Sequence, residues 1–537
     1  MNDLQQMLSD GWQVLNTAIQ TVRSSSQDPD EVQLELYSLA FGYASLEASN
    51  AFVASYNRNR DSVDSRTRET LEGLAQVFVA DSIHRLSHEV SSLLPSHTGS
   101  TSQATWKGVQ EYLSSRNLVR VGGLLRDRGT VPLPDFLGDE VDAMRSSVHR
   151  LTDERIVPHA QHIHRENLTV PDSIVRHIRD LGCFGMSVPT EYGGSRNIQE
   201  QDAIGMVVVT EELSRGSLGA AGSLITRPEI VVQALLEGGT EDQKQTWLPR
   251  LAEGDPLCAV SVTEPDTGSD VASISLRASR KENGWVLNGA KTWCTLAGKA
   301  GLLLVLARTD ASASPPHRGL SLFLVEKPVT DSLAFTHQSP GGGSLSGRAI
   351  ETLGYRGMHS FEMFFDDFFV PSDGLLGEEN GVNKGFYYTM RGFSAGRLQT
   401  AARAVGLMQA AYEESIVHCE NRVVFDRPLA SYPLTLAKLV RMMMYMVGTR
   451  QFCYEVVRAV QNKKGQVLAS LVKLLACRSA EWVTREAVQL HGGMGYAEES
   501  TVSRLFVDAR VLSIFEGAEE TLAVKVVGKA LIDGVLD

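Results

Sequence analysis

Apolar residues recur at three- and four-residue spacing over residues 4–93 of the chain. This spacing places apolar side chains on one face of an α-helix, so the segment is predicted to form several amphipathic helices. The polar run from Ser24 to Pro29 separates the first helix from the next. The residues expected on buried helix faces are Leu34, Leu36, Tyr37, Leu39, Ala40, Phe41, Leu71, Leu74, Val77, Phe78 and Ile83.

Two stretches interrupt the helical pattern before residue 135. Ser, Thr and Gly are frequent from Pro95 to Thr105, and two prolines lie in Val131–Pro134. Because proline fixes its own φ and restricts the residue before it, residues 131–134 are predicted to form a rigid connector at a domain boundary. Residues 135–257 follow a helical pattern again, with glycine-rich turns at 182–185 and 192–194.

The pattern changes at residue 258. Four apolar runs follow, at 286–289, 302–307, 320–325 and 362–370, and Gly, Asn or Pro residues punctuate them. Such runs are typical of β-strands. Long amphipathic patterns return beyond about residue 380. The predicted order is therefore two helical regions, a β-rich region and a third helical region.

Composition narrows the class of protein. The chain has 537 residues, of which 43% are hydrophobic and 21% charged, which is ordinary for a globular protein of more than one domain. The formal net charge of −13 argues against nucleic-acid binding, because that function needs a basic face. No apolar run approaches the length of a membrane span. The first residues also lack a signal-peptide pattern.

Cysteine and histidine positions suggest neither disulfides nor a metal. The six cysteines, at 183, 258, 294, 419, 453 and 477, have no CxxC or metal-ligand spacing, and a reducing, cytoplasmic location is therefore expected. His159, His162 and His164 lie close together in sequence. No acidic or thiol partner completes a ligand set with them, so no metal site is predicted.

Five short motifs between residues 263 and 520 carry the chemistry. They are Thr263–Asp270, Asn288–Thr295, Arg422–Leu429, Gln489–Tyr496 and Ser513–Glu520. Together they resemble the acyl-CoA dehydrogenase family, flavoproteins that desaturate a thioester between its α and β carbons. The resemblance covers residues 135–537. It implies a helical domain over 135–257, a β-barrel over 258–375 and a C-terminal four-helix bundle over 376–537, with residues 1–130 as a helical N-terminal extension. FAD would lie between the barrel and the bundle.

The first motif is rich in Pro, Gly, Asp and Ser, which is equally typical of a plain turn between two strands. The resemblance implies that this loop binds FAD through Val262, Thr263 and Ser269. Thr263 would face the isoalloxazine ring and Ser269 the pyrophosphate. Backbone N–H groups in such loops are suited to anions.

In the second motif the resemblance implies that Trp293 covers the flavin ring and that the Thr295 hydroxyl contacts N5. An aromatic ring and one hydroxyl donor suit the edge of a flavin. Taken alone, Trp293 is also typical of a hydrophobic core. Cys294 is expected to be a small buried residue.

In the third motif Arg422 and Phe425 resemble an Arg-x-x-Phe-Gly motif whose arginine reaches the FAD diphosphate, as a charge-assisted contact. Two positions differ from the family pattern. Asp426 replaces the usual glycine, and Pro433 stands where a glutamine usually contacts the cofactor.

In the fourth motif Gln489, Gly492 and Gly493 resemble a segment that meets FAD across a subunit interface. Glycine permits close approach of the backbone to a ligand. A helix C-cap is the alternative interpretation of Gly492 and Gly493.

The last motif contains the candidate base, Glu516. Members of the family place the catalytic glutamate either at this position or on another helix just before an arginine. The second position corresponds to Gly396 here, which cannot act as a base, so Glu516 is the remaining candidate. The resemblance also implies that Arg397 lies near the CoA end of the substrate and that Gly517 contributes to substrate binding.

The N-terminal extension and three further segments resemble those of family members that act on a short branched acyl-CoA with a distal carboxylate. The three segments are Arg227–Ile230, the insertion Pro340–Arg348 and Gly354–Ser360. A buried distal carboxylate would need a cation, and Arg227 is a candidate, with a surface or interface salt bridge as the alternative. The glycines at 341–343 lack the flanking strand and helix of a dinucleotide fingerprint and are predicted to form a flexible loop.

The implied reaction removes the α-proton with Glu516 and transfers a hydride from the β-carbon to FAD, with electrons passing to an electron-transfer flavoprotein. The chain is expected to be a homodimer with no nucleic-acid or membrane partner. Three alternatives remain. The first is a short- or branched-chain acyl-CoA dehydrogenase of other specificity, and the second is an acyl-CoA oxidase, which flavin reoxidation in air would reveal. The third is a non-catalytic DNA-associated relative of the alkylation-response type, which the acidic net charge disfavours.

Overall fold

The computed structural model describes residues 2–94, 101–197, 203–460 and 465–536. The chain forms two compact units: unit 1 combines residues 1–146 and 400–537, and unit 2 comprises residues 147–399. The chain passes between them within α6 (Asp139–Leu151) and α12 (Gly385–Asn421). The division into four domains expected from the sequence, over residues 1–130, 135–257, 258–375 and 376–537, stays a prediction. Residues 95–100 of the expected polar stretch lie outside the described residues.

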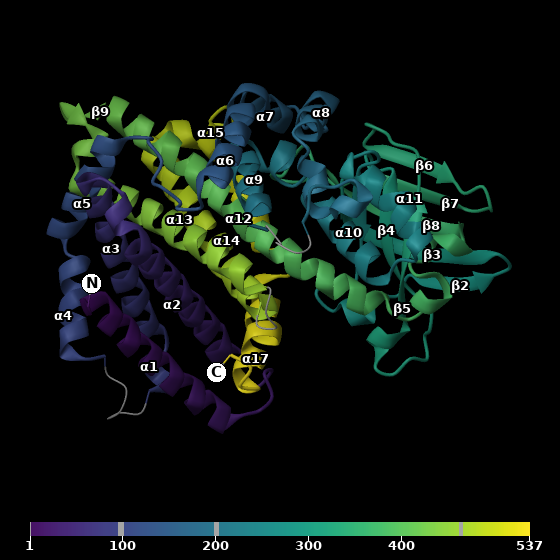
Figure 1. Cartoon of the computed structure of the whole chain (residues 1–537), viewed down its shortest axis with the longest axis horizontal. Helices are drawn as coiled ribbons and strands as arrows, with labels where there is room; N and C mark the ends of the chain where they lie inside the picture. Colours follow the sequence, from purple (N-terminus) through teal and green to yellow (C-terminus); the bar gives the residue numbers. More distant parts are fainter. Residues whose placement is uncertain (1, 95–100, 198–202, 461–464, 537) are drawn as a thin grey trace. The chain divides into compact units, whose positions relative to one another are not determined.

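The described residues of unit 1 are helical, apart from one short hairpin (Figure 1). Before α6 its elements are α1 (Asn2–Ser25), α2 (Gln33–Asn59), η1 (Arg60–Ser62), α3 (Ser65–Glu89), η2 (Ser91–Leu93), α4 (Gln103–Tyr112) and α5 (Ser115–Arg128). After α12 they are β9 (Val423–Val424), β10 (Arg427–Pro428), η11 (Leu429–Ser431), α13 (Pro433–Val460), α14 (Gly465–His491), η12 (Gly492–Tyr496), α15 (Thr501–Leu512), α16 (Glu519–Thr521), η13 (Leu522–Gly528) and α17 (Lys529–Ile532).

The N-terminal helices pack on the C-terminal helices of the same unit: α2, α3 and α5 contact α13, and α2 also contacts α14 and η13. The buried Phe78 ring meets Tyr445 edge-on, with ring centroids 6.2 Å apart. The Tyr445 hydroxyl donates to Asp81 at 2.8 Å, and Arg126 pairs with Glu420 at 2.7 Å. The apolar faces of the N-terminal helices are therefore buried inside unit 1.

One residue expected on those faces is not buried. The Leu34 side chain is 83% exposed, whereas Leu36 and Leu39 are buried. Successive helical residues are about 100° apart, so positions i and i+2 point to nearly opposite sides. Leu34 lies in the first turn of α2 on the side away from the core, and its assignment to the buried face was wrong.

Unit 2 begins with short helices and continues into a sheet. Its helices are η3 (Thr152–Ile156), α7 (Val157–Arg165), α8 (Asp172–Asp180), η4 (Cys183–Ser187), η5 (Thr190–Tyr192), α9 (Ala203–Gly216), η6 (Leu218–Gly222), α10 (Thr226–Gly238) and α11 (Glu241–Ala252). Its strands are β1 (Cys258–Ser261), β2 (Arg277–Lys281), β3 (Gly284–Thr295), β4 (Leu302–Arg308), β5 (Leu320–Glu326), β6 (Ala334–Gln338), β7 (Ser344–Ala349) and β8 (Ser360–Pro371). The 3-10 turns η7 (Val271–Ser273), η8 (Pro316–Gly319), η9 (Ser372–Gly374) and η10 (Glu378–Gly381) connect or follow the strands.

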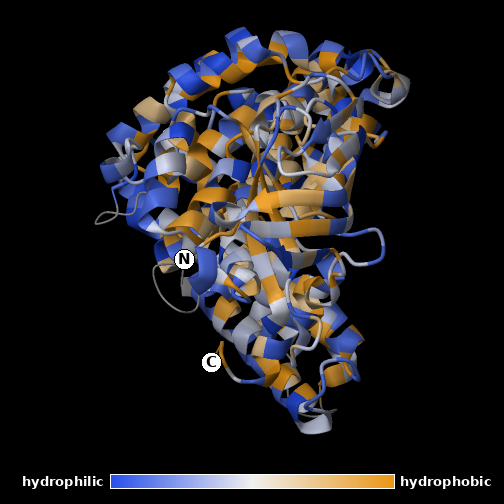
Figure 2. Ribbon diagram, turned by 90° about the vertical axis from the view of Figure 1, so that its right-hand side faces the viewer, coloured by the Kyte–Doolittle hydropathy of each residue, from blue (hydrophilic) through white to orange (hydrophobic). Residues whose placement is uncertain are grey.

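The eight strands form one curled sheet in the order β1-β4-β2-β3-β8-β7-β6, with β5 paired to β4. Strand β4 is buried on both faces: Leu303 and Val305 belong to one apolar cluster, and Leu302 and Leu304 to a second cluster that includes residues of α10 and α11. A strand buried on both sides reads as a continuous apolar run, as residues 302–307 do. Figure 2 shows hydrophobic and hydrophilic positions alternating along many of the helices.

The insertion at residues 340–348 is not only a loop. It contributes to a hairpin in which β6 pairs with β7, and β7 pairs with β8. The turn is closed by hydrogen bonds from Gly342 N to Ser339 O at 2.9 Å and from Ser339 N to Gly343 O at 3.0 Å. The glycine run therefore forms a defined, hydrogen-bonded turn.

Each of the six cysteines is a buried thiol. Three lie in each unit: Cys183, Cys258 and Cys294 in unit 2, and Cys419, Cys453 and Cys477 in unit 1. Among the described residues, the helices are all too short or too polar to cross a bilayer.

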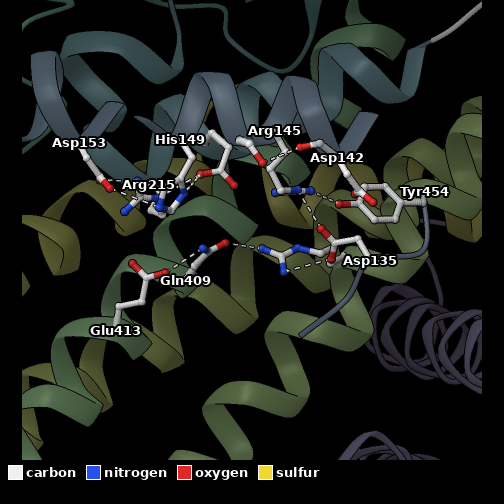
Figure 3. Close-up of polar contacts among 12 residues, drawn as sticks. Asp135, Asp142, Arg145, His149, Asp153, Arg215, Gln409, Glu413 and Tyr454 are labelled. Atoms are coloured by element: carbon white, nitrogen blue, oxygen red, sulfur yellow. Dashed lines mark hydrogen bonds and ion pairs between the residues drawn. The ribbon is translucent and has the colours of Figure 1, made fainter. Parts of the chain in front are cut away.

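Figure 3 shows polar networks from both units. In unit 1, Arg145 pairs with Asp135 at 2.9 Å and donates to the Tyr454 hydroxyl at 2.6 Å. In unit 2, His149 contacts the buried carboxylate of Glu212 at 2.8 Å and Asp153 at 3.3 Å. The hydrogen bond to Glu212 raises the pKa of His149 above its usual 6.5, and Asp153 adds to this, while burial and the neighbouring Arg215 oppose it.

The His149 network predicts a pH-dependent contribution to stability. A folded-state pKa raised above the unfolded value means that the contribution is complete below about pH 6.5 and is lost as pH rises through the folded pKa. We expect His149→Gln to lower the melting temperature more at about pH 6 than at about pH 9. Calorimetry of both proteins across this range checks it, and an equal loss at all pH values would contradict the assignment.

Candidate active site

The loop that follows β1 is anchored by a buried ion pair in unit 2. The Glu264 carboxylate accepts hydrogen bonds from Ser275 N at 2.6 Å, Leu276 N at 2.8 Å and Lys291 Nζ at 2.9 Å. Lys291 Nζ also donates to Val262 O at 2.8 Å, and its side chain is fully buried. The Val262–Glu264 backbone is thereby tied to β3, while Ser269 remains exposed.

The pKa values of this pair follow from burial and mutual attraction. Burial lowers the pKa of Lys291 to about 8, although Glu264 opposes the shift. Burial acts to raise the pKa of Glu264, but Lys291 and the backbone donors outweigh it and lower the value. Because breaking a buried pair leaves one charge uncompensated, the loop depends on both partners. Neither was assigned a role from the sequence.

Trp293 points outward from an irregular part of β3. The pairing with β8 shifts register between Lys291 and Cys294, and Trp293 takes a left-handed φ of 56°. Its side chain is 55% exposed, whereas Cys294 is fully buried, as expected for Cys294. A bulky residue at positive φ is strained and persists only where its surroundings hold it. The interpretation of Trp293 as a core residue is wrong.

The neighbouring predicted residues lie on the same part of unit 2. Thr292 N donates to Thr263 O at 2.9 Å, which joins the loop to the strand that carries Trp293. The Thr295 hydroxyl contacts the Ser360 hydroxyl at 3.1 Å and is buried. The structure therefore brings Val262, Thr263, Trp293 and Thr295 together.

Arg227 lies buried at the start of α10, not on the surface. Its charge acts to lower the pKa of the buried Cys258 and Cys294 thiols, although burial dominates and raises both. The guanidinium thus acts on Cys294, which neighbours Trp293 in β3. Arg397, the other candidate cation in unit 2, is half-buried on α12 next to the buried Gly396.

In unit 1, Phe425 and Asp426 form the two-residue turn of the β9–β10 hairpin. Their φ values of 49° and 65° are those of a type I′ turn. Aspartate tolerates this conformation, which explains how Asp426 replaces the family's glycine. Phe425 is 92% exposed at the tip, and Arg422 is exposed beside it. Pro433 is the first residue of α13, where its fixed φ suits a helix start.

The Gln489 segment lies beside the end of α12, the helix that precedes this hairpin. His418, near the end of α12, stacks on His491 at the end of α14 with ring centroids 4.1 Å apart. Gly492 follows α14 at φ 61°, the conformation of a helix C-cap. Gln489, Gly492 and Gly493 are exposed. Gly492 therefore has the conformation of a helix C-cap. The contact of this segment with FAD stays a prediction.

Glu516 lies in the short segment between α15 and α16 and takes a left-handed φ of 55°, followed by Gly517 at 102°. Lys473 Nζ donates to Gly517 O at 2.6 Å. Ser513, at the start of the segment, donates to Glu481 of α14. A non-glycine residue in this region costs about 1–3 kcal/mol, and such strain clusters at functional sites.

Sequence reasoning missed the anchors on α14, namely Lys473 and Glu481. A signal was present for one of them: Lys473 interrupts the apolar run Leu471-Val472-Lys473-Leu474-Leu475, and its side chain is fully buried. A charge in such a run must be paired when it is buried. Its partner, a backbone carbonyl 44 residues away, has no sequence signature.

Comparison with known proteins identifies the family. The N-terminal, middle and C-terminal domains of acyl-CoA dehydrogenases match residues 138–255, 259–368 and 383–532. The chain therefore belongs to the acyl-CoA dehydrogenase family. It is an FAD-dependent oxidoreductase that acts on the CH–CH bond of an acyl-CoA. Residues before 138 lie outside the three matches.

One sequence relative and two solved structures show what this chain is similar to. The (2S)-methylsuccinyl-CoA dehydrogenase of Cereibacter sphaeroides is 41% identical over 401 residues, which cover 74% of this chain and 70% of that protein. The structure of butyryl-CoA dehydrogenase from Megasphaera elsdenii is 29% identical, with a TM-score of 0.67 over 74% of this chain and 100% of that chain. A chain from a structure of the electron transferring flavoprotein of Acidaminococcus fermentans is 25% identical, with a TM-score of 0.66 over 74% and 99% of the two chains.

The surface of unit 2 fits a flavin. Trp293 presents an exposed aromatic side chain held outward by its backbone, beside a loop whose Ser269 is exposed. An open aromatic face and an exposed hydroxyl match an isoalloxazine ring and a pyrophosphate. When bound, FAD supplies the acceptor for a hydride from the substrate's β-carbon.

Proposed function

We propose that the chain dehydrogenates (2S)-methylsuccinyl-CoA to mesaconyl-CoA, a step of the ethylmalonyl-CoA pathway. The N-terminal extension, the Arg227–Ile230 segment, the 340–348 insertion and the Gly354–Ser360 segment all look like those of (2S)-methylsuccinyl-CoA dehydrogenase. The 41% identity to the Cereibacter sphaeroides enzyme supports this substrate. The observation that carries the reaction is the strained backbone of Glu516, because strain of this kind marks a residue held for a purpose.

Glu516 acts as the base in this proposal. Its carboxylate removes the α-proton, and the alternative base position is occupied by Gly396. The backbone N–H of Glu516 donates to the thioester carbonyl and stabilises the negative charge that develops there, which lowers the barrier to proton removal. Gly517 leaves room for the substrate beside the base, and Arg397 serves the CoA end.

The remaining predicted residues serve FAD. In unit 2 they are Val262, Thr263, Ser269, Trp293 and Thr295; in unit 1 they are Arg422, Phe425, Gln489, Gly492 and Gly493. In unit 1, Phe425 of the hairpin and Met494 and Tyr496 of η12 have exposed side chains, at 92%, 59% and 87%. Large exposed apolar residues are common at interaction sites. They support a homodimer in which these residues of one copy reach the other.

The electron acceptor in this proposal is an electron-transfer flavoprotein. The fold similarity to a chain from the Acidaminococcus fermentans structure supports an association between this fold and such proteins. Slow reoxidation of the reduced enzyme in air, together with rapid reoxidation by that partner, is the expected behaviour, and rapid reoxidation by oxygen alone would identify an oxidase instead.

Arg227 is the proposed partner of the distal carboxylate, since a buried carboxylate needs a cation and this guanidinium is buried. We expect methylsuccinyl-CoA to reduce the flavin faster than butyryl-CoA or isobutyryl-CoA. Arg227→Ala should weaken the binding of the dicarboxylic substrate by about tenfold or more, which corresponds to the loss of one charged hydrogen bond. Bleaching of the flavin absorption band by a panel of acyl-CoAs measures both effects.

Lys299→Ala provides a control for this variant, because Lys299 is a buried cation of the same unit that pairs with Asp172 and Asp331. Its removal should not discriminate between the two classes of substrate. If Arg227→Ala affects butyryl-CoA as strongly as methylsuccinyl-CoA, the carboxylate assignment is wrong. If butyryl-CoA is the best substrate, the proposed substrate is wrong as well.

A further inference from the structure

The segment that bears Glu516 is held by two helices of unit 1. Helix α14 provides Lys473 and Glu481, as described above. The segment ends at Glu519, whose carboxylate accepts from Arg478 of α14 at 2.7 Å and from the hydroxyl of Tyr37. Tyr37 belongs to α2, in the part of the chain that precedes the family domains.

Arg478 is fixed by the same helix α2. Its guanidinium lies 3.3 Å from the centre of the Phe41 ring and 5.2 Å from that of Tyr37, and it also donates to the Tyr37 hydroxyl. Phe41 and Tyr37 are one helical turn apart and contact each other edge-on, with ring centroids 5.3 Å apart. Charge-assisted hydrogen bonds are stronger than neutral ones, and a guanidinium over an aromatic ring is attracted to the ring's face, so these contacts fix the position of Arg478.

The protonation state of Tyr37 suits this arrangement. Burial and the hydrogen bond to Glu519 raise the pKa of its phenol to about 12, although Arg478 opposes the shift. The hydroxyl therefore keeps its proton throughout the neutral range and donates to the Glu519 carboxylate while it accepts from Arg478.

The same helix packs against the residues that follow Glu519. A methyl group on Gly528 of η13 would lie 2.8 Å from Leu36 Cδ1, so the two backbones approach closely at this point. Lys525 pairs with Asp30, just before α2, and Arg23 donates to Leu531 O at 2.6 Å. The N-terminal helices thus fix the whole stretch from Glu519 to Leu531.

We infer that α2 of the N-terminal extension positions the catalytic base: Tyr37 and Phe41 hold Arg478 and Glu519, and these fix the strained Glu516–Gly517 turn. This inference rests on the proposed role of Glu516. Tyr37 and Arg478 act through the segment and not on the substrate, so they are positioning residues. The strain at Glu516 needs such support because an unsupported segment would relax to an ordinary φ, and a small displacement of a base costs rate.

Tyr37→Phe is the direct test, because it removes one hydroxyl and keeps the ring under Arg478. We expect flavin reduction at saturating substrate to slow by about tenfold, while FAD content and the substrate dissociation constant stay unchanged. Tyr43→Phe is the matched control: Tyr43 lies on the same helix, and its hydroxyl donates to Leu536 O at 3.3 Å, near the C-terminal end of the described residues. It should reduce flavin at the normal rate.

Combining Tyr37→Phe with Glu516→Gln distinguishes a role in positioning the base from a general effect on the structure. In Glu516→Gln the base is already absent, so adding Tyr37→Phe should slow reduction by less than about twofold, since effects on one function do not add. Equal slowing in both backgrounds would overturn the inference and indicate a general structural role. Arg478→Lys, which keeps the charge but loses the planar contact with Phe41, should behave like Tyr37→Phe.

Two results distinguish the inference from the proposed function. A normal rate in Tyr37→Phe and Arg478→Lys, with a severe loss in Glu516→Gln, would overturn the positioning role alone. A near-normal rate in Glu516→Gln would overturn the assignment of the base, and the positioning role with it.

Discussion

Glu516→Gln is expected to slow flavin reduction by at least about a hundredfold, the usual range for loss of a general base. Glutamine has nearly the same shape as glutamate but cannot accept the α-proton, so FAD and acyl-CoA should still bind. Rapid mixing with substrate under anaerobic conditions measures the reduction rate, and a titration of the flavin spectrum with a non-reducing acyl-CoA analogue measures binding.

The control for this experiment is Glu520→Gln, since Glu520 is an exposed carboxylate four residues further along the chain. It should reduce flavin at the normal rate. A near-normal rate in Glu516→Gln would mean that another group takes the proton. Because Gly396 cannot do so, the base would then have to be sought outside the motifs that identified the family.

Removal of residues 1–130 is expected to abolish the soluble, well-folded protein. The deletion would uncover the apolar surface of α13 and α14 on which α2, α3 and α5 pack, and exposed surface of that kind promotes association. The full chain should behave in light scattering as two subunits of 58.6 kDa. The truncated chain should aggregate or form larger assemblies.

A milder variant keeps this prediction testable when the deletion does not yield protein. Phe78→Ala leaves a cavity against Phe52 and Tyr445 and should cost about 3–5 kcal/mol of stability, while the protein stays dimeric. A tetramer of the full chain would contradict the view that the extension covers an association surface. A soluble, stable dimer after deletion would show that it covers nothing essential.

The main features of the fold could be predicted because they depend on local patterns. Helical spacing located the helices over residues 4–93, and continuous apolar runs located β4 and β5. Strands β6 and β7 were missed because they lie toward the edge of the sheet, where Ala334–Gln338 and Ser344–Ala349 contain few apolar residues. Their strand conformation comes from pairing, of β7 with β8 and of β6 with β7, which no local pattern reports.

The candidate site could likewise be predicted only where it depends on residues that are close in sequence. Motifs of eight residues sufficed to identify the family and to select Trp293 and Glu516, because each motif is contiguous in sequence. The supporting contacts are not contiguous: Tyr37 and Glu519 are 482 residues apart, and Lys291 lies 27 residues from Glu264. Such pairs follow from packing, so only the structure reveals which charged side chains hold the motifs in position.

The distribution of thiols has a practical consequence. Burial raises the pKa of Cys183 and Cys294 in unit 2, and of Cys419 and Cys477 in unit 1, to about 12. Because the thiolate is the reactive form, an alkylating reagent modifies these positions only during excursions that open the surrounding packing. Peptide mass spectrometry after timed alkylation would therefore compare how often each unit opens in the native protein, without any engineered label.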